Sequence, residues 1–185
     1  MIVETAPPAE PEEADLDEAG ASEADQVPTE APPKAPEVPP KEACEDDYFW
    51  ESTAKYKDYR KGVGATQVNT NATSRTGKSS FTSEATGTVT VGVSGKLKTK
   101  ASIAVAEIET EYSVNLSVSL TAKIGNTYTI DTPPHTTTNA RCGVYRLKTA
   151  GYSQYHYANC TKGVKHNATL YSPHEISWYV WEAKA

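Results

Sequence analysis

The sequence predicts an all-β domain, mainly antiparallel and sandwich-like with long hairpin strands, preceded by a disordered acidic N-terminal tail. Residues 1–47 carry 15 Asp or Glu, only two Lys, and nine of the 12 prolines. Residues 48–185 are instead rich in Thr, Ser, Val and Tyr, and they alternate apolar with polar side chains, as strands with one buried face do. We therefore divide the chain into a tail, 1–47, and a β-rich domain, 48–185.

The tail and the domain have opposite net charges. The tail has a net charge of -13 and the domain one of +7, which together give the -6 of the whole chain. A segment of Pro, Glu, Ala and Asp buries too little apolar surface to offset its chain entropy. We therefore expect the tail to be disordered, and its proline-rich part, 28–40, to be stiff and extended. The first residues do not form a basic and then apolar signal peptide, so we expect the numbering to begin at a processed or trimmed end.

The longest alternation in the domain runs from residue 86 to residue 130. Its apolar positions form two runs: Val89, Val91, Val93, Leu97, Ala101, Ile103 and Val105, then Tyr112, Val114, Leu116, Val118, Leu120, Ala122 and Ile124. A period of two predicts a strand for each run. The phase changes between Glu107 and Glu111, where a turn, a bulge or a short helix are all compatible with the sequence.

Shorter strands are predicted over 128–132, 142–148, 155–160 and 176–181. The breaks between them are Gly125-Asn126, Pro133-Pro134, Gly151, Gly163 and Ser172-Pro173. The last strand carries alternating aromatic residues, which we interpret as closing the core or an edge of the sheet.

The spacing of the cysteines predicts a disulfide. Between Cys142 and Cys160 the sequence alternates on both sides of Gly151, like a hairpin with its turn at that glycine. In such a hairpin the two cysteines lie opposite each other, close enough to bond. We therefore predict a Cys142–Cys160 bridge and an oxidising, extracellular location. Cys44 then remains in the tail, either free or bonded to another chain.

No catalytic, cofactor or metal site is predicted. The four histidines share no spacing typical of zinc, and Gly77-Lys78-Ser79 lacks the first glycine of a phosphate-binding loop. Glu107, Glu109 and Glu111 are interpreted as a solvated strand face. The lysines are spread over the domain and the acidic tail would compete with phosphate, so we expect no nucleic-acid partner.

Three consecutive aromatic residues follow the tail: Tyr48, Phe49 and Trp50. They either begin the first strand of the domain or form an anchor that docks into a partner protein, because aromatic residues dominate interface hot spots. Both alternatives remain open from the sequence, and the three residues are the candidate partner-binding site.

Several runs resemble a group of small secreted actinobacterial proteins: YRKGVGATQVNTNATS, TGTVTVGVSGKL, SLTAKIGNTYTI, TPPHTTTNARCGVYRLK and SPHEISWYVWE. The resemblance covers about residues 56–182 and excludes the tail. Within that group, it fits best the small linker subunit of umbrella toxin particles, which joins a lectin-like subunit to a large stalk-and-ring subunit. The resemblance implies no catalytic residues.

Two functions are therefore predicted. The first is a secreted, non-enzymatic adaptor that tethers larger secreted proteins in an extracellular assembly through its tail and β domain. The alternative is an aerolysin-like pore-forming toxin in which the strands of 86–124 form an amphipathic hairpin, with its apolar face on lipid and its polar face on the lumen. The membrane is a partner only under this alternative.

Overall fold

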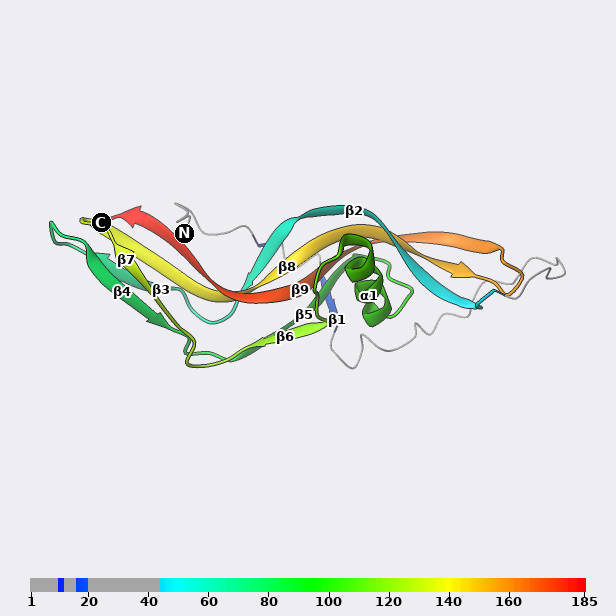
Figure 1. Ribbon diagram of the computed structural model, residues 1–185, viewed down its shortest axis with the longest axis horizontal. Coiled ribbons are helices and arrows are strands. Elements are labelled where there is room, and N and C mark those ends of the chain that lie inside the picture. The colour runs from blue at the N-terminus through cyan, green and yellow to red at the C-terminus, as the bar shows by residue number, and fades with distance from the viewer. Residues whose placement is uncertain (1–9, 12–15, 20–43) are drawn as a thin grey trace.

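The computed structural model describes residues 10–11, 16–19 and 44–185, and it confirms an antiparallel, almost entirely β fold with one short helix (Figure 1). Most of the tail predicted to be disordered lies outside the described residues. The elements are β1 Asp17–Ala19, β2 Asp47–Gly62, β3 Gln67–Asn71, β4 Gly77–Thr82, β5 Gly87–Gly95, α1 Ala101–Tyr112, β6 Ser119–Ala122, β7 Thr127–Thr132, β8 Thr136–His156 and β9 Lys162–Lys184.

Two long strands form the backbone of the fold. Strands β8 and β9 pair antiparallel from Thr136↔Lys184 to His156↔Lys162, and they run along most of the elongated molecule (Figure 1). Strand β2 pairs with the other edge of β8, and the order of the main sheet is β1-β5-β9-β8-β2. Strands β4 and β7 form a separate two-stranded sheet at the end that also holds the C-terminus.

The main core lies where α1 packs against the sheet. Its buried residues are Trp50, Val91, Val93, Ala104, Val105, Ile108, Leu147, Ala168 and Leu170. Each large apolar side chain in such a cluster contributes about 1.5–3 kcal/mol on burial. Five elements supply this core: strands β2, β5, β8 and β9 of the main sheet and helix α1. Of these, β5 and α1 come from the segment between residues 87 and 122.

Two arginines are also buried in the sheet. Arg60 of β2 and Arg146 of β8 lie with their guanidinium carbons 3.9 Å and 5.7 Å from the ring centres of Tyr179 and Tyr171. Burial lowers the pKa of Arg60 to about 10, so it remains a cation at neutral pH. Stacking on aromatic rings compensates part of the lost hydration of such a buried cation.

The hairpin predicted around Gly151 is wrong, because β8 continues through this residue. Gly151 pairs with Ser52 on one side and Ala168 on the other. A Cβ at this position would lie 2.4 Å from Cζ2 of Trp50 and 2.4 Å from the Glu51 carbonyl oxygen. The glycine therefore makes room for a buried tryptophan and does not mark a turn.

The chain reverses instead between Tyr157 and Thr161. Cys160 has a φ of 63°, and its N–H donates to the Tyr157 carbonyl at 2.8 Å. The Asn159 side-chain oxygen accepts from the N–H and the hydroxyl of Thr161 at 3.1 and 2.6 Å, which closes an Asx-type turn. Gly163, Ser172 and Pro173, predicted as breaks, lie inside β9.

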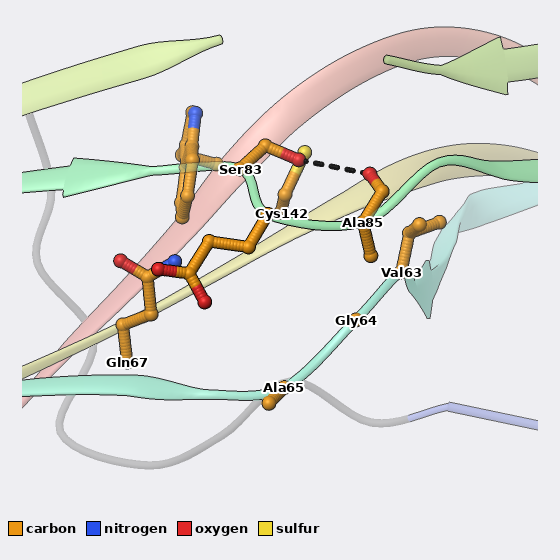
Figure 2. A pocket seen from close by; sticks show the side chains of 9 residues that line it. Val63, Gly64, Ala65, Gln67, Ser83, Ala85 and Cys142 are labelled. Atoms are coloured by element: carbon orange, nitrogen blue, oxygen red, sulfur yellow. Dashed lines mark hydrogen bonds between the residues drawn. The ribbon is translucent and has the colours of Figure 1, made fainter. Parts of the chain in front are cut away.

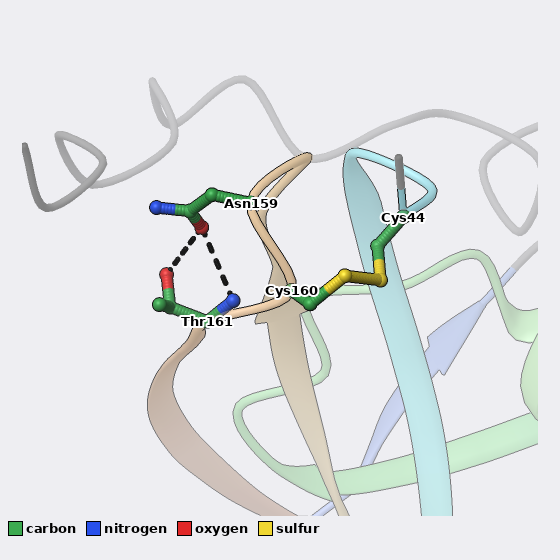
Figure 3. Close-up of a disulfide and its surroundings, with 4 residues drawn as sticks. All are labelled: Cys44, Asn159, Cys160 and Thr161. Carbon is green, nitrogen blue, oxygen red and sulfur yellow. Dashed lines mark hydrogen bonds between the residues drawn. A yellow bond between two sulfur atoms is a disulfide. The ribbon is translucent and has the colours of Figure 1, made fainter. Parts of the chain in front are cut away.

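The predicted Cys142–Cys160 disulfide is wrong for the same reason. Cys160 bonds to Cys44, 116 residues earlier in the chain (Figure 3). Cys142 is a buried free thiol opposite Trp178. Because β8 does not fold back at Gly151, Cys142 and Cys160 are not cross-strand neighbours, and the end of the predicted tail is covalently attached to the domain.

The other strand predictions hold in part. The predicted strand 128–132 is confirmed as β7, and 142–148 and 176–181 are parts of β8 and β9. The first alternating run ends as a strand at Gly95, and the phase change is part of helix α1.

Replacing Cys44 with serine should lower the free energy of unfolding by about 2–5 kcal/mol, because the bond closes a long loop in the unfolded chain. Denaturant unfolding of the two proteins measures the difference. Cys142→Ala is the control, since it removes the other cysteine and leaves the bond intact. Non-reducing peptide mapping should show residues 44 and 160 cross-linked, and a 142–160 linkage would contradict the structure.

Candidate functional site

The segment from residue 87 to residue 122, here called the hairpin segment, leaves the sheet and returns to it. Its two ends, β5 and β6, pair antiparallel with the register Gly87↔Ala122, Thr88↔Thr121, Val89↔Leu120 and Thr90↔Ser119. The Val91 N–H donates to the Val118 carbonyl at 2.9 Å and extends this ladder by one step. Beyond this point the two arms diverge, with β5 pairing with β9 and the other arm leading back to α1.

Continuing the same register beyond Val91 would make the whole segment an amphipathic hairpin. One face would carry Val89, Val91, Val93, Gly95, Leu97, Thr99, Ala101, Ile103, Ala106, Ile108, Thr110, Tyr112, Val114, Leu116, Val118, Leu120 and Ala122. The other face would carry Lys96, Lys98, Lys100, Glu107, Glu109 and Glu111, which are all the charged residues of the segment. Every charge therefore falls on one side.

The continued register also places opposite charges face to face. Lys98 would lie directly opposite Glu111, and Lys100 directly opposite Glu109. Directly opposed residues of opposite charge stabilise an antiparallel pair by roughly 0.2–1 kcal/mol. The register of the β5–β6 ladder therefore also brings opposite charges together at residues that lie outside this ladder.

Helix α1 is capped at its C-terminal end, where the Ser113 N–H donates to the Glu109 carbonyl, but no side chain caps its N-terminal end. Its N-cap, Lys100, makes no side-chain hydrogen bond, and no acidic residue lies in the first turn. The acidic residues Glu109 and Glu111 lie instead near the C-terminal end, where the helix dipole is negative. Several β-branched residues, including Ile103 and Val105, lower its helix propensity further. Tertiary packing therefore supplies most of the stability of α1.

That packing is incomplete beside the loop that follows α1. Val114, Asn115 and Leu116 line a cavity of about 510 Å³ together with Lys55, Leu147 and His174 of the sheet. The loop is held by the Leu116 N–H, which donates to the Glu109 carboxylate at 2.7 Å, and by the Ser117 N–H, which donates to the Pro173 carbonyl at 2.7 Å. Val114 and Leu116 pack against the main core and remain only partly buried there.

The base of the segment packs more tightly. A Cβ on Gly87 would lie 2.7 Å from Cγ1 of Val63, so β5 starts in close contact with the end of β2. A second cavity, of about 240 Å³, lies beside this base and is lined by residues that include Val63, Ser83 and Cys142 (Figure 2). The Ser83 hydroxyl donates to the Ala85 carbonyl at 3.2 Å across its rim.

His166 of β9 lies next to the first arm. Burial, followed by the nearby charges of Lys98 and Lys96, lowers the pKa of His166 below its usual value. The Tyr48 ring faces it from β2, with ring centres 6.4 Å apart. Protonation of His166 would add a third positive charge to this cluster and weaken the attachment of the arm.

The candidate partner-binding residues lie at the start of β2. The side chains of Tyr48 and Trp50 are buried, and Phe49 stacks on His156 at 4.5 Å between ring centres. The structure therefore places them in the first long strand of the domain, as one of the two sequence alternatives predicted. Glu107, Glu109 and Glu111, predicted as a solvated strand face, lie on α1.

Over residues 10–11, 16–19 and 44–185, no group of three or more His, Cys, Asp or Glu side chains is arranged to hold a metal ion. In the same part of the chain, no helix has the length and apolar character needed to cross a membrane.

No protein-family model matches the chain, and no curated protein matches it. A solved structure described as the crystal structure of lamprey immune protein is similar over 74% of this chain and 53% of its own length, with 9% identity and a TM-score of 0.33. The chain thus spans about half of that protein, and a similarity of this size carries no inference about fold or function.

Acidification should destabilise the protein through His166. A pKa lowered in the folded state means that the unfolded chain binds the proton more readily, so stability falls as the pH drops below about 6.5. His166→Gln should reduce the loss of Tm between about pH 7.5 and about pH 5.5 without removing it, since burial also lowers the pKa of His156. His135→Asn, in an exposed loop, is the control. An unchanged pH dependence in His166→Gln would exclude this contribution.

A better N-cap should stabilise the helical form of the segment. Lys100→Ser supplies an oxygen to the first turn, worth about 1 kcal/mol, and removes a positive charge from the positive end of the helix. Thermal unfolding should shift upward by roughly 2–5 °C. Lys98→Ser, two residues earlier and outside α1, should not produce this increase; equal shifts in both variants would mean that capping is not the cause.

Proposed function

We propose that the protein is a secreted, non-enzymatic pore-forming protein whose hairpin segment straightens into an amphipathic hairpin, and that hairpins from several copies line a pore. The observation that carries the proposal is the register of β5 and β6. Continued through the segment, it separates all charged residues from an uninterrupted uncharged face. A sheet with one wet face in a folded domain needs such alternation only over the strands it contains, whereas here it extends through a helix and a loop.

The uncharged face is suited to lipid. Arms 88–103 and 106–121 are longer than the about 9–11 residues that a membrane-crossing strand needs. The face carries branched aliphatic residues and one tyrosine, with Thr99 and Thr110 its only polar side chains. Both threonines are uncharged, so neither adds the desolvation energy of an ion in hydrocarbon.

The charged face is suited to a water-filled lumen. Its lysines and glutamates number three each, so one hairpin contributes no net charge from these pairs. The lysines lie on the first arm and the glutamates on the second, so Lys98–Glu111 and Lys100–Glu109 would attract each other across the strands while they stay hydrated. The remaining positions of this face are mostly serine and threonine, together with Asn115.

More than one copy is required by backbone hydrogen bonding. A single hairpin has two outer edges, and in lipid each unpaired N–H or C=O group costs several kcal/mol. A closed ring of hairpins satisfies these groups because each outer edge pairs with the next chain. We therefore propose that the active form is an oligomer.

The adaptor function predicted first from the sequence receives less support. It depended on a tail that is free to reach a partner and on an exposed aromatic anchor. Cys44 is bonded to Cys160, Tyr48 and Trp50 are buried, and Glu10 and β1 contact the domain. The disulfide supports an oxidising location outside the cell under either function.

A charge on the lipid face should abolish pore formation. Val114→Lys places an ammonium group on that face. Near the membrane centre this charge would destabilise the inserted hairpin by about 2–4 kcal/mol per chain. The neighbouring Asn115→Lys places the same group on the lumen face. Val114 is partly buried against the core whereas Asn115 is exposed, so thermal unfolding of both variants first checks that each one folds. Dye release from phosphatidylcholine–cholesterol vesicles should be lost in the first variant and kept in the second. Equal loss or equal activity would contradict the proposed faces.

Reversing one charge pair should test the continued register directly. Lys98→Glu puts two glutamates opposite each other and should slow dye release, and Glu111→Lys alone should do the same with two lysines. The double variant restores an opposite pair and should recover most of the rate. A double variant as slow as the sum of the single effects would mean that residues 98 and 111 do not pair.

A further inference from the structure

Two arginines from different strands lie side by side on one face of the main sheet. Gly62 of β2 pairs directly with Gly143 of β8, and directly opposed residues of an antiparallel pair present the same face. A Cβ on Gly62 would overlap the guanidinium of Arg141, and a Cβ on Gly143 would lie 2.8 Å from Nε of Arg60. Because neither glycine has a side chain, one guanidinium lies over each of them. Two cations are therefore held close together on the sheet.

The Arg60 guanidinium is buried and has donors that its surroundings do not use. Only 1% of the residue is exposed, and its guanidinium carbon lies 3.9 Å from the ring centre of Tyr179. Its Nη2 donates to the Arg141 carbonyl, whereas its Nε and Nη1 have no hydrogen-bond partner among the described residues. A buried, charged donor without an acceptor destabilises the fold. An anion that reached these two nitrogens would therefore bind favourably.

A carboxylate of the chain already lies at this pair of arginines. Oε1 of Glu10 accepts from the Gly62 N–H at 2.9 Å and lies 3.5 Å from Nη1 of Arg141. Burial is the main cause of the lowered pKa of Arg60, and the charges of Glu10 and Arg141 also act on that pKa, so the three charged groups lie near one another. Glu10 thus shows the chemistry that this place accepts, which is an oxyanion that binds a backbone N–H and arginine donors together.

The charge and the donors of the site exceed what one carboxylate supplies. Two guanidiniums carry two positive charges, Glu10 brings one negative charge, and a phosphomonoester carries about -1.5 to -2 near pH 7. A phosphomonoester also has more acceptor oxygens, and arginine binds such groups through parallel N–H bonds. Arg141 is already oriented, since its Nε donates to the Gly64 carbonyl at 3.0 Å. A phosphate therefore matches the site better than Glu10 does.

We propose that Arg60, Arg141 and the Gly62 N–H form a binding site for a phosphomonoester group, and that Glu10 occupies this site when no phosphate is bound. The site lies beside the base of the hairpin segment, because Gly62 ends β2 one residue before its contact with the start of β5. Phosphate binding does not depend on pore formation, so the two proposals can fail separately. The same group occurs in free phosphate and in the headgroup of phosphatidic acid, and the experiment separates these sources.

Calorimetric titration of the full-length protein with inorganic phosphate, at constant ionic strength in chloride, tests the site. Glu10→Gln removes the competing carboxylate and keeps the size of the side chain, so this variant should bind phosphate about tenfold more tightly than the unchanged protein. Adding Arg141→Gln should lower the affinity of Glu10→Gln by a similar factor. Glu84→Gln and Arg75→Gln make the same charge changes at exposed positions and should have neither effect. Thermal unfolding first shows that each variant is folded.

Two further readouts locate the site and identify the source of the phosphate. The amide resonance of Gly62 should shift when inorganic phosphate is added to Glu10→Gln. Sedimentation with phosphatidylcholine vesicles that contain phosphatidic acid, lost on Arg141→Gln but kept on Arg75→Gln, would assign the phosphate to a lipid headgroup. Binding of inorganic phosphate without this sedimentation would assign it to a free phosphate. Either source supports the site.

Three results would overturn the inference. Glu10→Gln that binds neither inorganic phosphate nor the vesicles would exclude the site. An equal loss of affinity in Arg141→Gln and Arg75→Gln would mean general attraction between charges. Equal affinity of Glu10→Gln and the unchanged protein would contradict Glu10 as the occupant. Phosphate binding by a protein that releases no dye would support the site and contradict the proposed function.

Discussion

The four-residue ladder between β5 and β6 is the constraint on which the rest of the account depends. It fixes which residues of the hairpin segment would face each other if the two arms continued to pair. A register shifted by one residue would place a lysine opposite an apolar residue and mix the two faces. The ladder present in the structure therefore already specifies the separation of charged and uncharged residues that the proposed pore would need.

Residues 101–112 have an apolar pattern that is compatible both with a helix and with an extended strand. In the structure, α1 buries Ala101, Ala104, Val105 and Ile108 at helical spacing, and the last three of these pack in one core with Trp50 and Leu147. If the segment were extended, a period of two would instead place Ala101, Ile103, Ala106 and Ile108 on one face. The unfilled N-cap of α1, the cavity beside the loop and the pairing of β1 with β5 make the helical arrangement depend on tertiary contacts, whereas β8 and β9 are held by a ladder that runs from Thr136↔Lys184 to His156↔Lys162.

The β class and the amphipathic strands followed from the sequence because a period of two is a local property. The disulfide and the helix did not. The sequence around Gly151 predicts a turn, but the glycine is required by the ring of Trp50, which belongs to strand β2 far earlier in the chain. Helix α1 depends on tertiary packing that outweighs its strand-like alternation. Strand β1 does not follow from the sequence either, since an acidic segment with few apolar residues gives no sign of pairing with β5.

A cross-linking measurement between residues 100 and 109 tests the central claim most directly. In the soluble protein these residues are the N-cap and a late position of α1, nine residues apart, so their Cα atoms lie about 13 Å apart and cysteines there cannot bond. In the continued hairpin they are directly opposite, about 5 Å apart. We expect Lys100→Cys/Glu109→Cys, in a Cys142→Ala background, to form the disulfide only on vesicles and only together with dye release. Dye release without this cross-link would contradict the register.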